Sequence, residues 1–137
     1  MTTPYSGGCA CGAVRYQIAA EPLAQVHCQC RECQRVSGTG HGSYLVFGAR
    51  DTLTATGATT TWRVQGDSGN FKLHRFCPAC GAPVFVDFEA APDMVAVHPA
   101  SLDDPARFAP GMVTYTKSAQ PWDRVDPGLT ACLAGPG

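Results

Sequence analysis

The sequence has few charged residues and no excess of either sign. Charged side chains make up 15% of the 137 residues, below the roughly 25% of an average soluble domain, and 10 Lys and Arg stand against 11 Asp and Glu. Non-specific nucleic-acid binding depends on a surplus of basic side chains that neutralise phosphates. The charge balance therefore argues against a nucleic acid as a partner.

Long apolar runs are also missing. No stretch approaches the ~20 apolar residues that a membrane helix needs. The first residues, Met-Thr-Thr-Pro-Tyr-Ser-Gly-Gly-Cys, have neither the basic start nor the apolar segment of a secretory signal. We therefore expect no membrane association and a cytoplasmic location, where thiols stay reduced and grouped cysteines are typical of metal ligands or catalytic groups.

No helical repeat of apolar residues extends beyond about two turns. Apolar residues instead alternate with polar ones or form short runs between turn signals, which predicts a mainly-β protein of eight or nine short strands. One short helix is expected from Arg31 to Val36. We expect a single domain over residues 1–132 and a loose Pro- and Gly-rich tail over 133–137. Strands are expected near 14–18, 44–47, 60–64, 71–73, 84–88, 94–97 and 112–115.

Cysteine, by contrast, is abundant: the chain has eight, and seven of them form three clusters. Residues i and i+2 of an extended segment point to the same face, so each C-x-C pair can reach one ion. A C-x-x-C pair needs a tight turn, and Gly81 after the last cluster, like Gly12 after the first, has the permissive backbone for it. The clusters are Cys9-Ala-Cys11, Cys28-Gln-Cys30-Arg-Glu-Cys33 and Cys77-Pro-Ala-Cys80.

The number of cysteines in each cluster predicts two different metal sites. The outer pairs together offer four thiolates, which is the ligand set of a closed structural zinc site, whereas the middle cluster offers three and leaves a position for water or substrate. Thiolates favour zinc over magnesium or calcium, and the spacings match neither common ferredoxin pattern for an iron–sulfur cluster. We therefore predict two zinc ions, one structural and one catalytic.

Other interpretations of the cysteines stay open at this point. The outer four could be buried thiols or could form disulfides. The middle three could form a second structural site, closed by His27, His41 or Cys132. His27 would point to the opposite face of a strand from its neighbour Cys28, and Cys132 has no partner at a ligand spacing, so a free thiol is its better interpretation.

Several segments resemble the glutathione-dependent formaldehyde-activating enzyme family, which is also seen in centromere protein V. The residues from Gly7 to Tyr16 are similar to the opening of the family, those from Cys28 to Gly38 to its C-x-C-x-x-C block, and those from Arg75 to Gly81 to its second cysteine turn. Residues 100–105 and 117–122 resemble its C-terminal signature. Many members have a His where this chain has Met112, so the substrate contacts there are expected to differ.

The resemblance implies a complex of small coiled antiparallel β-sheets around a structural zinc, similar to methionine sulfoxide reductase B. It assigns Cys9, Cys11, Cys77 and Cys80 to the structural ion, and Cys28, Cys30 and Cys33 to the catalytic ion. It also implies a carbon–sulfur lyase that joins formaldehyde and glutathione into S-hydroxymethylglutathione, with a small thiol such as glutathione as its partner.

The residues themselves favour chemistry on a thiol at the open three-cysteine site. His41, between two glycines, is the candidate for proton transfer, and we place Arg35 beside it as a catalytic candidate. Arg31 and Lys117, with Arg35, are candidates to hold the carboxylates of a glutathione-like tripeptide. The alternatives are a non-catalytic zinc scaffold or thiol-binding module and, less in keeping with the charge balance, a nucleic-acid-binding zinc ribbon.

Overall fold

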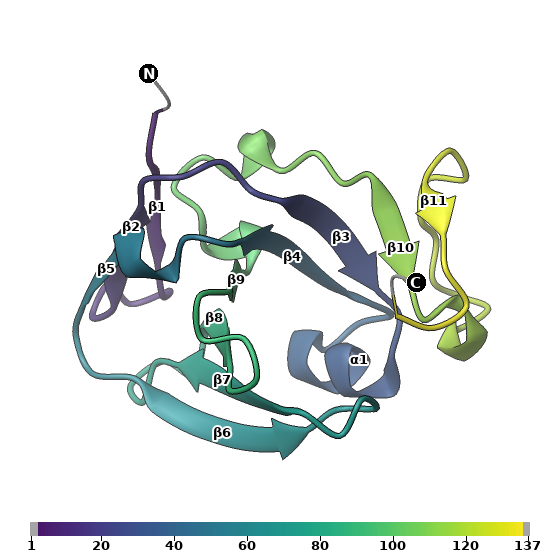
Figure 1. The fold of residues 1–137 in the computed structure, drawn as a ribbon, viewed down its shortest axis with the longest axis horizontal. Helices are drawn as coiled ribbons and strands as arrows, with labels where there is room; N and C mark the ends of the chain where they lie inside the picture. The colour runs from purple at the N-terminus through teal and green to yellow at the C-terminus, as the bar shows by residue number, and fades with distance from the viewer. Residues whose placement is uncertain (1–2, 136–137) are drawn as a thin grey trace.

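The computed structural model describes residues 3–135 and shows a mainly-β protein (Figure 1). Within this range the chain forms eleven strands, one α-helix and four short 3-10 helices. The α-helix is α1 (Arg31–Ser37). The strands are β1 (Tyr5–Gly8), β2 (Arg15–Ile18), β3 (Ala24–Cys28), β4 (Gly42–Phe47), β5 (Leu53–Thr56), β6 (Thr60–Gln65), β7 (Phe71–Phe76), β8 (Pro83–Phe88), β9 (Val95–Val97), β10 (Met112–Thr114) and β11 (Thr130–Ala131). The 3-10 helices are Arg50–Thr52, Pro99–Ser101, Pro105–Arg107 and Thr116–Ser118.

The prediction of a mainly-β fold with one short helix is confirmed, and each of the seven expected strands is present. The predicted number of eight or nine strands is too low: β1, β3, β5 and β11 are short strands outside the seven expected ones. β1 contains two glycines and β11 has only two residues, so neither carries a pattern that marks a strand locally.

The strands form two sheets of unequal size. A three-stranded sheet has the order β1-β2-β5, and an eight-stranded sheet has the order β11-β10-β3-β4-β9-β8-β7-β6. Pairing is antiparallel except at β10, which runs parallel to both β3 and β11. Figure 1 shows the small sheet at one end of the molecule and α1 beside the middle of the large sheet.

The central strands of the large sheet carry apolar side chains on both faces. On β4, Leu45 and Phe47 pack into the main core together with residues of the small sheet. Tyr44 and the partly buried Val46 belong to a second cluster. Because side chains alternate across a strand, one face of the sheet supports the main core, and the other is left for a separate group of side chains. Cys28 of β3 and Cys33 of α1 belong to this second cluster.

The C-terminal segment runs beside β10. The backbone carbonyls of Cys132, Leu133 and Ala134 accept hydrogen bonds from the amides of Thr116, Lys117 and Tyr115. The predicted tail over 133–137 thus begins with hydrogen-bonded residues, and 136–137 lie outside the described residues. Across 3–135, no helix has the length and apolar character to cross a membrane.

His98, directly after β9, is expected to make the protein less stable in acid. It packs beside the Tyr44 ring, and burial lowers its pKa from 6.5 to about 4. The unfolded chain therefore takes up a proton below about pH 6.5 that the folded chain does not bind until about pH 4. Stability should fall by about 2 kcal/mol between pH 7.5 and 5 through this residue. Urea unfolding of the wild type and His98→Gln at both pH values measures the difference, and equal losses in the two proteins would contradict it.

Candidate metal centres and the cleft beside them

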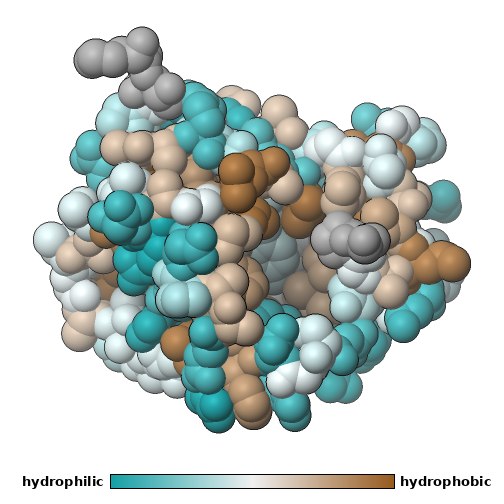
Figure 2. Space-filling model, viewed as in Figure 1, coloured by the Kyte–Doolittle hydropathy of each residue, from teal (hydrophilic) through white to brown (hydrophobic). Residues whose placement is uncertain are grey.

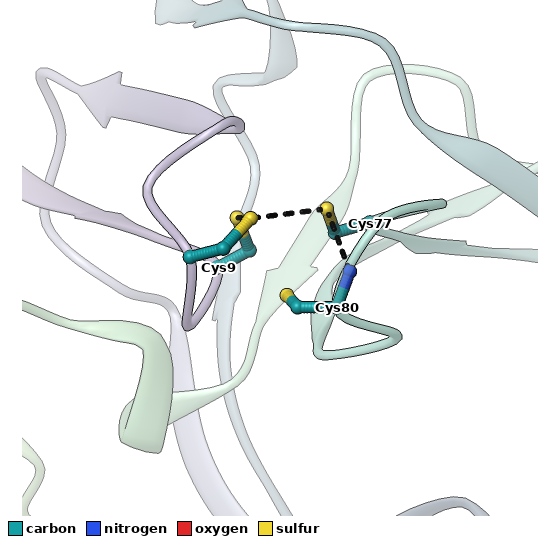
Figure 3. A group of neighbouring side chains, drawn as sticks. Cys9, Cys77 and Cys80 are labelled. Carbon is teal, nitrogen blue, oxygen red and sulfur yellow. Dashed lines mark hydrogen bonds between the residues drawn. The ribbon is translucent and has the colours of Figure 1, made fainter.

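The outer four cysteines come together from two loops, and Figure 3 labels three of them, Cys9, Cys77 and Cys80. Cys9 and Cys11 follow β1, and Cys77 and Cys80 lie in the turn between β7 and β8. Both turns use glycine as expected from the sequence: Gly12 and Gly81 have φ angles of +83° and +75°, which a residue with a side chain rarely adopts. We call Cys9, Cys11, Cys77 and Cys80 the quartet.

The four sulfurs of the quartet lie within 4.8 Å of one another, and two of the distances between them match a tetrahedral zinc site. The Sγ atoms of Cys9 and Cys11 are 3.6 Å apart, and those of Cys11 and Cys77 are 3.7 Å apart. Four sulfurs at the usual Zn–S distance of ~2.3 Å are separated by about 3.8 Å. All eight cysteines are free thiols, so the disulfide interpretation does not describe this structure. The quartet could hold a metal ion.

Backbone amides around the quartet favour thiolates over thiols. The amide of Val14 donates to Cys9 Sγ at 3.2 Å and lowers the pKa of Cys9 to about 6. The amides of Ala82 and Cys11 lower the pKa of Cys80. Since the thiolate is the form that binds a metal, these amides prepare Cys9 and Cys80 for a cation. At Cys11 the Ala13 amide lowers the pKa, but the neighbouring cysteines outweigh it and raise the pKa of that thiol to about 11.

The middle three cysteines meet where β3 ends and α1 begins. Cys28 is the last residue of β3, Cys30 is the N-cap of α1, and Cys33 lies in its first turn. The Cys30 sulfur accepts a hydrogen bond from the Cys33 amide at 3.2 Å. The C-x-x-C spacing of Cys30 and Cys33 therefore also caps the start of the helix. Tyr44 on β4 donates its hydroxyl to Cys33 Sγ at 3.2 Å. We call Cys28, Cys30 and Cys33 the trio.

The trio is also arranged so that it could hold a metal ion, with its three sulfurs within 4.8 Å of one another. Hydrogen bonds from the Cys30 and Cys33 thiols lower the pKa of Cys28 to about 2. Contact with the Cys28 thiolate raises the pKa of Cys33, and burial adds to that rise. Cys28 is therefore a thiolate that accepts hydrogen bonds from two neighbouring thiols. A divalent cation bound by all three sulfurs would replace the remaining two protons.

No fourth His, Cys, Asp or Glu among residues 3–135 joins the trio. His27 points to the other face of β3, where its Nδ1 lies 2.8 Å from Ser43 Oγ. His41 lies against His27, and its Nδ1 is 2.9 Å from Asp123 Oδ2. Cys132 lies beside β10, where its amide donates to the Val113 carbonyl. These three residues were the candidates to close the site, and none of them belongs to the group.

The trio lies between two cavities of opposite character. Cys28, Cys33 and Lys72 line both of them. The polar cavity, of about 340 Å³, is lined further by Cys30, Arg31, Glu32, Asp67, Tyr115 and Lys117. The apolar cavity, of about 370 Å³, is lined by Val26, Tyr44, Val46, His74, Val86, Phe88, Met94, Ala96 and Met112, among others. Figure 2 shows a hollow in this face of the molecule, with hydrophobic residues on its rim.

A charged network joins α1 to β7 beside the trio. Glu32 Oε2 is 2.5 Å from Lys72 Nζ and 3.1 Å from His74 Nε2. Burial alone would raise the pKa of Glu32, but the hydrogen bonds from His74 and Lys72 outweigh it and lower that pKa. Burial opposes the ammonium of Lys72, and the contact with Glu32 raises its pKa in turn. Both groups are therefore charged at neutral pH.

His74 is the least expected residue of the cleft. It is buried, Trp62 stacks on its ring, and it lines the apolar cavity. Its Nδ1 is buried and has no hydrogen-bond partner within the part of the chain that the structure describes. A buried polar atom without a partner is rare in folded proteins and calls for an explanation.

The structure brings only some of the sequence-predicted residues to the trio. Arg31 and Lys117 line the polar cavity, as a role in carboxylate binding requires. Arg35 is exposed and lines neither cavity. His41 lies with Asp123 and His27, on the side of β3 that faces away from Cys28, and the structure does not bring it to the trio. The physical reason is alternation: His41 packs against His27, whose side chain faces away from that of its neighbour Cys28.

Sequence reasoning missed Lys72, His74 and Tyr44. Each lies inside an ordinary strand pattern, and nothing in the local spacing connects it to a cysteine cluster. No local signal marks His74, because it takes an ordinary polar position in the alternation Phe71-Lys72-Leu73-His74.

The chain matches a known protein family over most of its length. A profile of the family described as "Glutathione-dependent formaldehyde-activating enzyme" matches residues 4–118. The chain belongs to this family. It is 26% identical over 135 residues to a Halomonas elongata protein named "Putative glutathione-dependent formaldehyde-activating enzyme", covering 94% of this chain and 86% of the relative.

A solved structure shows the same fold. The crystal structure of a Rhodobacter sphaeroides protein superposes with a TM-score of 0.58 at 21% identity, covering 93% of this chain and 98% of the other. Within the formaldehyde-activating family match, residues 4–118, lie all seven clustered cysteines, whereas Cys132 lies outside it. Met112, the position where the resemblance led us to expect different substrate contacts, lines the apolar cavity.

Proposed function

We propose that this protein is a zinc-dependent carbon–sulfur lyase that makes or breaks the adduct of a small thiol with an aldehyde, with glutathione and formaldehyde as the pair that the family description implies. The observation that carries the proposal is the trio: three sulfurs at the boundary of a cleft, with no fourth ligand among residues 3–135. Three protein ligands and an open position are typical of catalytic zinc, and four of structural zinc.

The two cysteine groups would hold the two ions. We assign Cys9, Cys11, Cys77 and Cys80 to a structural zinc, and Cys28, Cys30 and Cys33 to the second. A zinc ion in the trio would supply a position where a substrate thiol is held as its thiolate, the reactive form of sulfur. The remaining chemistry depends on side chains of this chain.

The polar cavity suits the carboxylates of a thiol-bearing peptide. Arg31, Lys72 and Lys117 line it and provide three cationic groups beside the trio. Glu32 neutralises part of the charge of Lys72, so Arg31 and Lys117 are the stronger candidates. Binding there would place the cysteine sulfur of the peptide next to the trio, and positioning of this kind supplies a large part of the acceleration of a reaction between two molecules.

His74 is our candidate for proton transfer, in place of His41. With Nε2–H donating to Glu32, the Nδ1 lone pair is free in a buried position beside the apolar cavity. During breakdown of the adduct, the hydroxyl proton moves to Nδ1, the carbonyl double bond forms, and the carbon–sulfur bond breaks with its electron pair on sulfur. During formation the same proton returns from Nδ1 to the carbonyl oxygen.

His74→Gln is expected to lower turnover about 100-fold while the KM for the thiol changes less than about twofold, since general acid–base groups contribute roughly 10²–10⁴. The Gln amide can still donate to Glu32, so the charged network survives. Steady-state kinetics of the two proteins at the same pH measures the effect. His41→Gln is the matched control and should stay within about threefold of wild type. The reverse ranking would return the role to His41.

The direct test is a measurement of exchange between glutathione, formaldehyde and S-hydroxymethylglutathione by NMR. The zinc-loaded protein should raise the exchange rate in proportion to its concentration, above the spontaneous rate at the same pH. Removal of zinc by a chelator and its replacement should abolish and restore the effect. Tight glutathione binding without any acceleration would overturn the proposal and favour the alternative, a non-catalytic thiol-binding module.

A further inference from the structure

The apolar cavity is larger than the reaction with formaldehyde needs. Formaldehyde has two heavy atoms and occupies about two water volumes, or ~60 Å³. The cavity measures about 370 Å³, which is within the range of sites that hold small organic ligands. It begins at Cys28 and Cys33, so any group attached to the reacting carbon would extend into it.

The walls of this cavity select against polar groups. It is lined by Val46, Val86, Phe88, Met94 and Met112. Most polar side chains around it already have partners: Lys72 forms an ion pair with Glu32, and the Tyr44 hydroxyl donates a hydrogen bond to Cys33. Water there would find few partners, and a site of that kind is filled favourably by an apolar group. The buried Nδ1 of His74 is the exception among the described atoms, and it is one that could pair with a hydroxyl.

We infer that the carbonyl substrate of this protein carries an aliphatic chain of several carbons, and that the chain occupies the apolar cavity. The inference rests on the proposed function and deepens it. The adduct is then an S-(1-hydroxyalkyl) thiol. Its peptide part lies in the polar cavity, its sulfur lies at the trio, its hydroxyl faces His74, and its alkyl chain lies among the valines and methionines.

Binding of stable analogues tests the inference without turnover. S-methylglutathione and S-hexylglutathione differ by five methylene groups, and burial of each is worth a factor of about four in affinity. Isothermal titration of the zinc-loaded protein should show at least 30-fold tighter binding of the hexyl compound. Equal affinities for the two analogues would overturn the inference.

Two variants test whether the hexyl group of the ligand binds in the apolar cavity. Ala96→Leu adds bulk to a buried position in the cavity wall and should reduce the hexyl preference to less than about fivefold. Ala55→Leu makes the same change at an exposed position of β5 and should keep the preference of wild type. If Ala96→Leu does not fold, Met112→Gln replaces an apolar wall residue at nearly constant volume and should also reduce the preference. A hexyl preference that survives every folded cavity variant would show that the chain binds elsewhere and would overturn the inference.

Turnover separates failure of this inference from failure of the proposed function. The exchange measurement is repeated with formaldehyde, butanal and hexanal as the carbonyl partner of glutathione. Acceleration that is at least tenfold greater for hexanal than for formaldehyde supports the inference. Acceleration with formaldehyde alone would overturn the inference and leave the proposed function standing, whereas no acceleration with any aldehyde would overturn both.

Discussion

Cys30→Ser is expected to lower turnover by at least ~1,000-fold and to remove one of two bound zinc ions, while the protein stays folded. A metal centre contributes several kcal/mol to the stabilisation of a transition state, and about 4 kcal/mol corresponds to that factor. Two sulfurs would hold the second ion too weakly to retain it through purification.

The fold should survive because of the particular place of Cys30. Its side chain caps α1 by accepting the Cys33 amide, and a Ser hydroxyl is among the best groups for that position. The quartet is untouched. Metal analysis, circular dichroism and the exchange measurement together test the prediction. Full turnover with a single zinc, or loss of both ions together with the fold, would contradict a division into a structural and a catalytic site.

Cys77→Ser is expected to have the largest effect on stability. A structural zinc site contributes about 10–16 kcal/mol of binding free energy to the folded state, which is as large as the whole stability of a typical domain. Cys77 is fully buried in the main core, and its sulfur also accepts the amides of Ala79 and Cys80. The variant should therefore show no cooperative unfolding transition at 25 °C.

Cys132→Ser is the matched control for both cysteine variants. It removes one thiol of the same chain, outside the quartet and the trio, so zinc content, turnover and melting temperature should all remain close to those of wild type. Thermal unfolding followed by circular dichroism, with zinc measured in the same samples, gives the comparison. A folded Cys77→Ser protein that retains two zinc ions would show that the quartet is not a structural metal site.

The cysteine clusters and the mainly-β fold could be predicted because both depend on local spacing. C-x-C and C-x-x-C pairs fix which sulfurs can reach one ion, and Gly12 and Gly81 permit the turns at positive φ where the structure has them. The α1 helix was placed to within one residue, because its N-cap is itself one of the cysteines. The number of strands was underestimated where a strand, such as β1, has no apolar alternation.

The catalytic candidates show the limit of this reasoning. His41 is only eight residues from Cys33 and was expected beside it, yet it lies with Asp123 across the sheet. His74 is more than forty residues from the trio and lines the same cleft as Cys28 and Cys33. Separation along the chain therefore does not tell which of the two histidines lies beside the trio. Only the pairing of the strands and the contact of α1 with β7 through Glu32 place them.

The sequence by itself determined the number of thiols, their division into groups of four and three, and the two glycine turns of the quartet, because these depend on the geometry of a few neighbouring residues. The tertiary structure alone decided what surrounds the trio: a polar cavity on one side, an apolar cavity on the other, and the Glu32–His74 contact beside them. The physical reason is that neighbours across a sheet follow from strand order and register. Both are set by the packing of apolar surfaces distant in the chain, which no local pattern encodes.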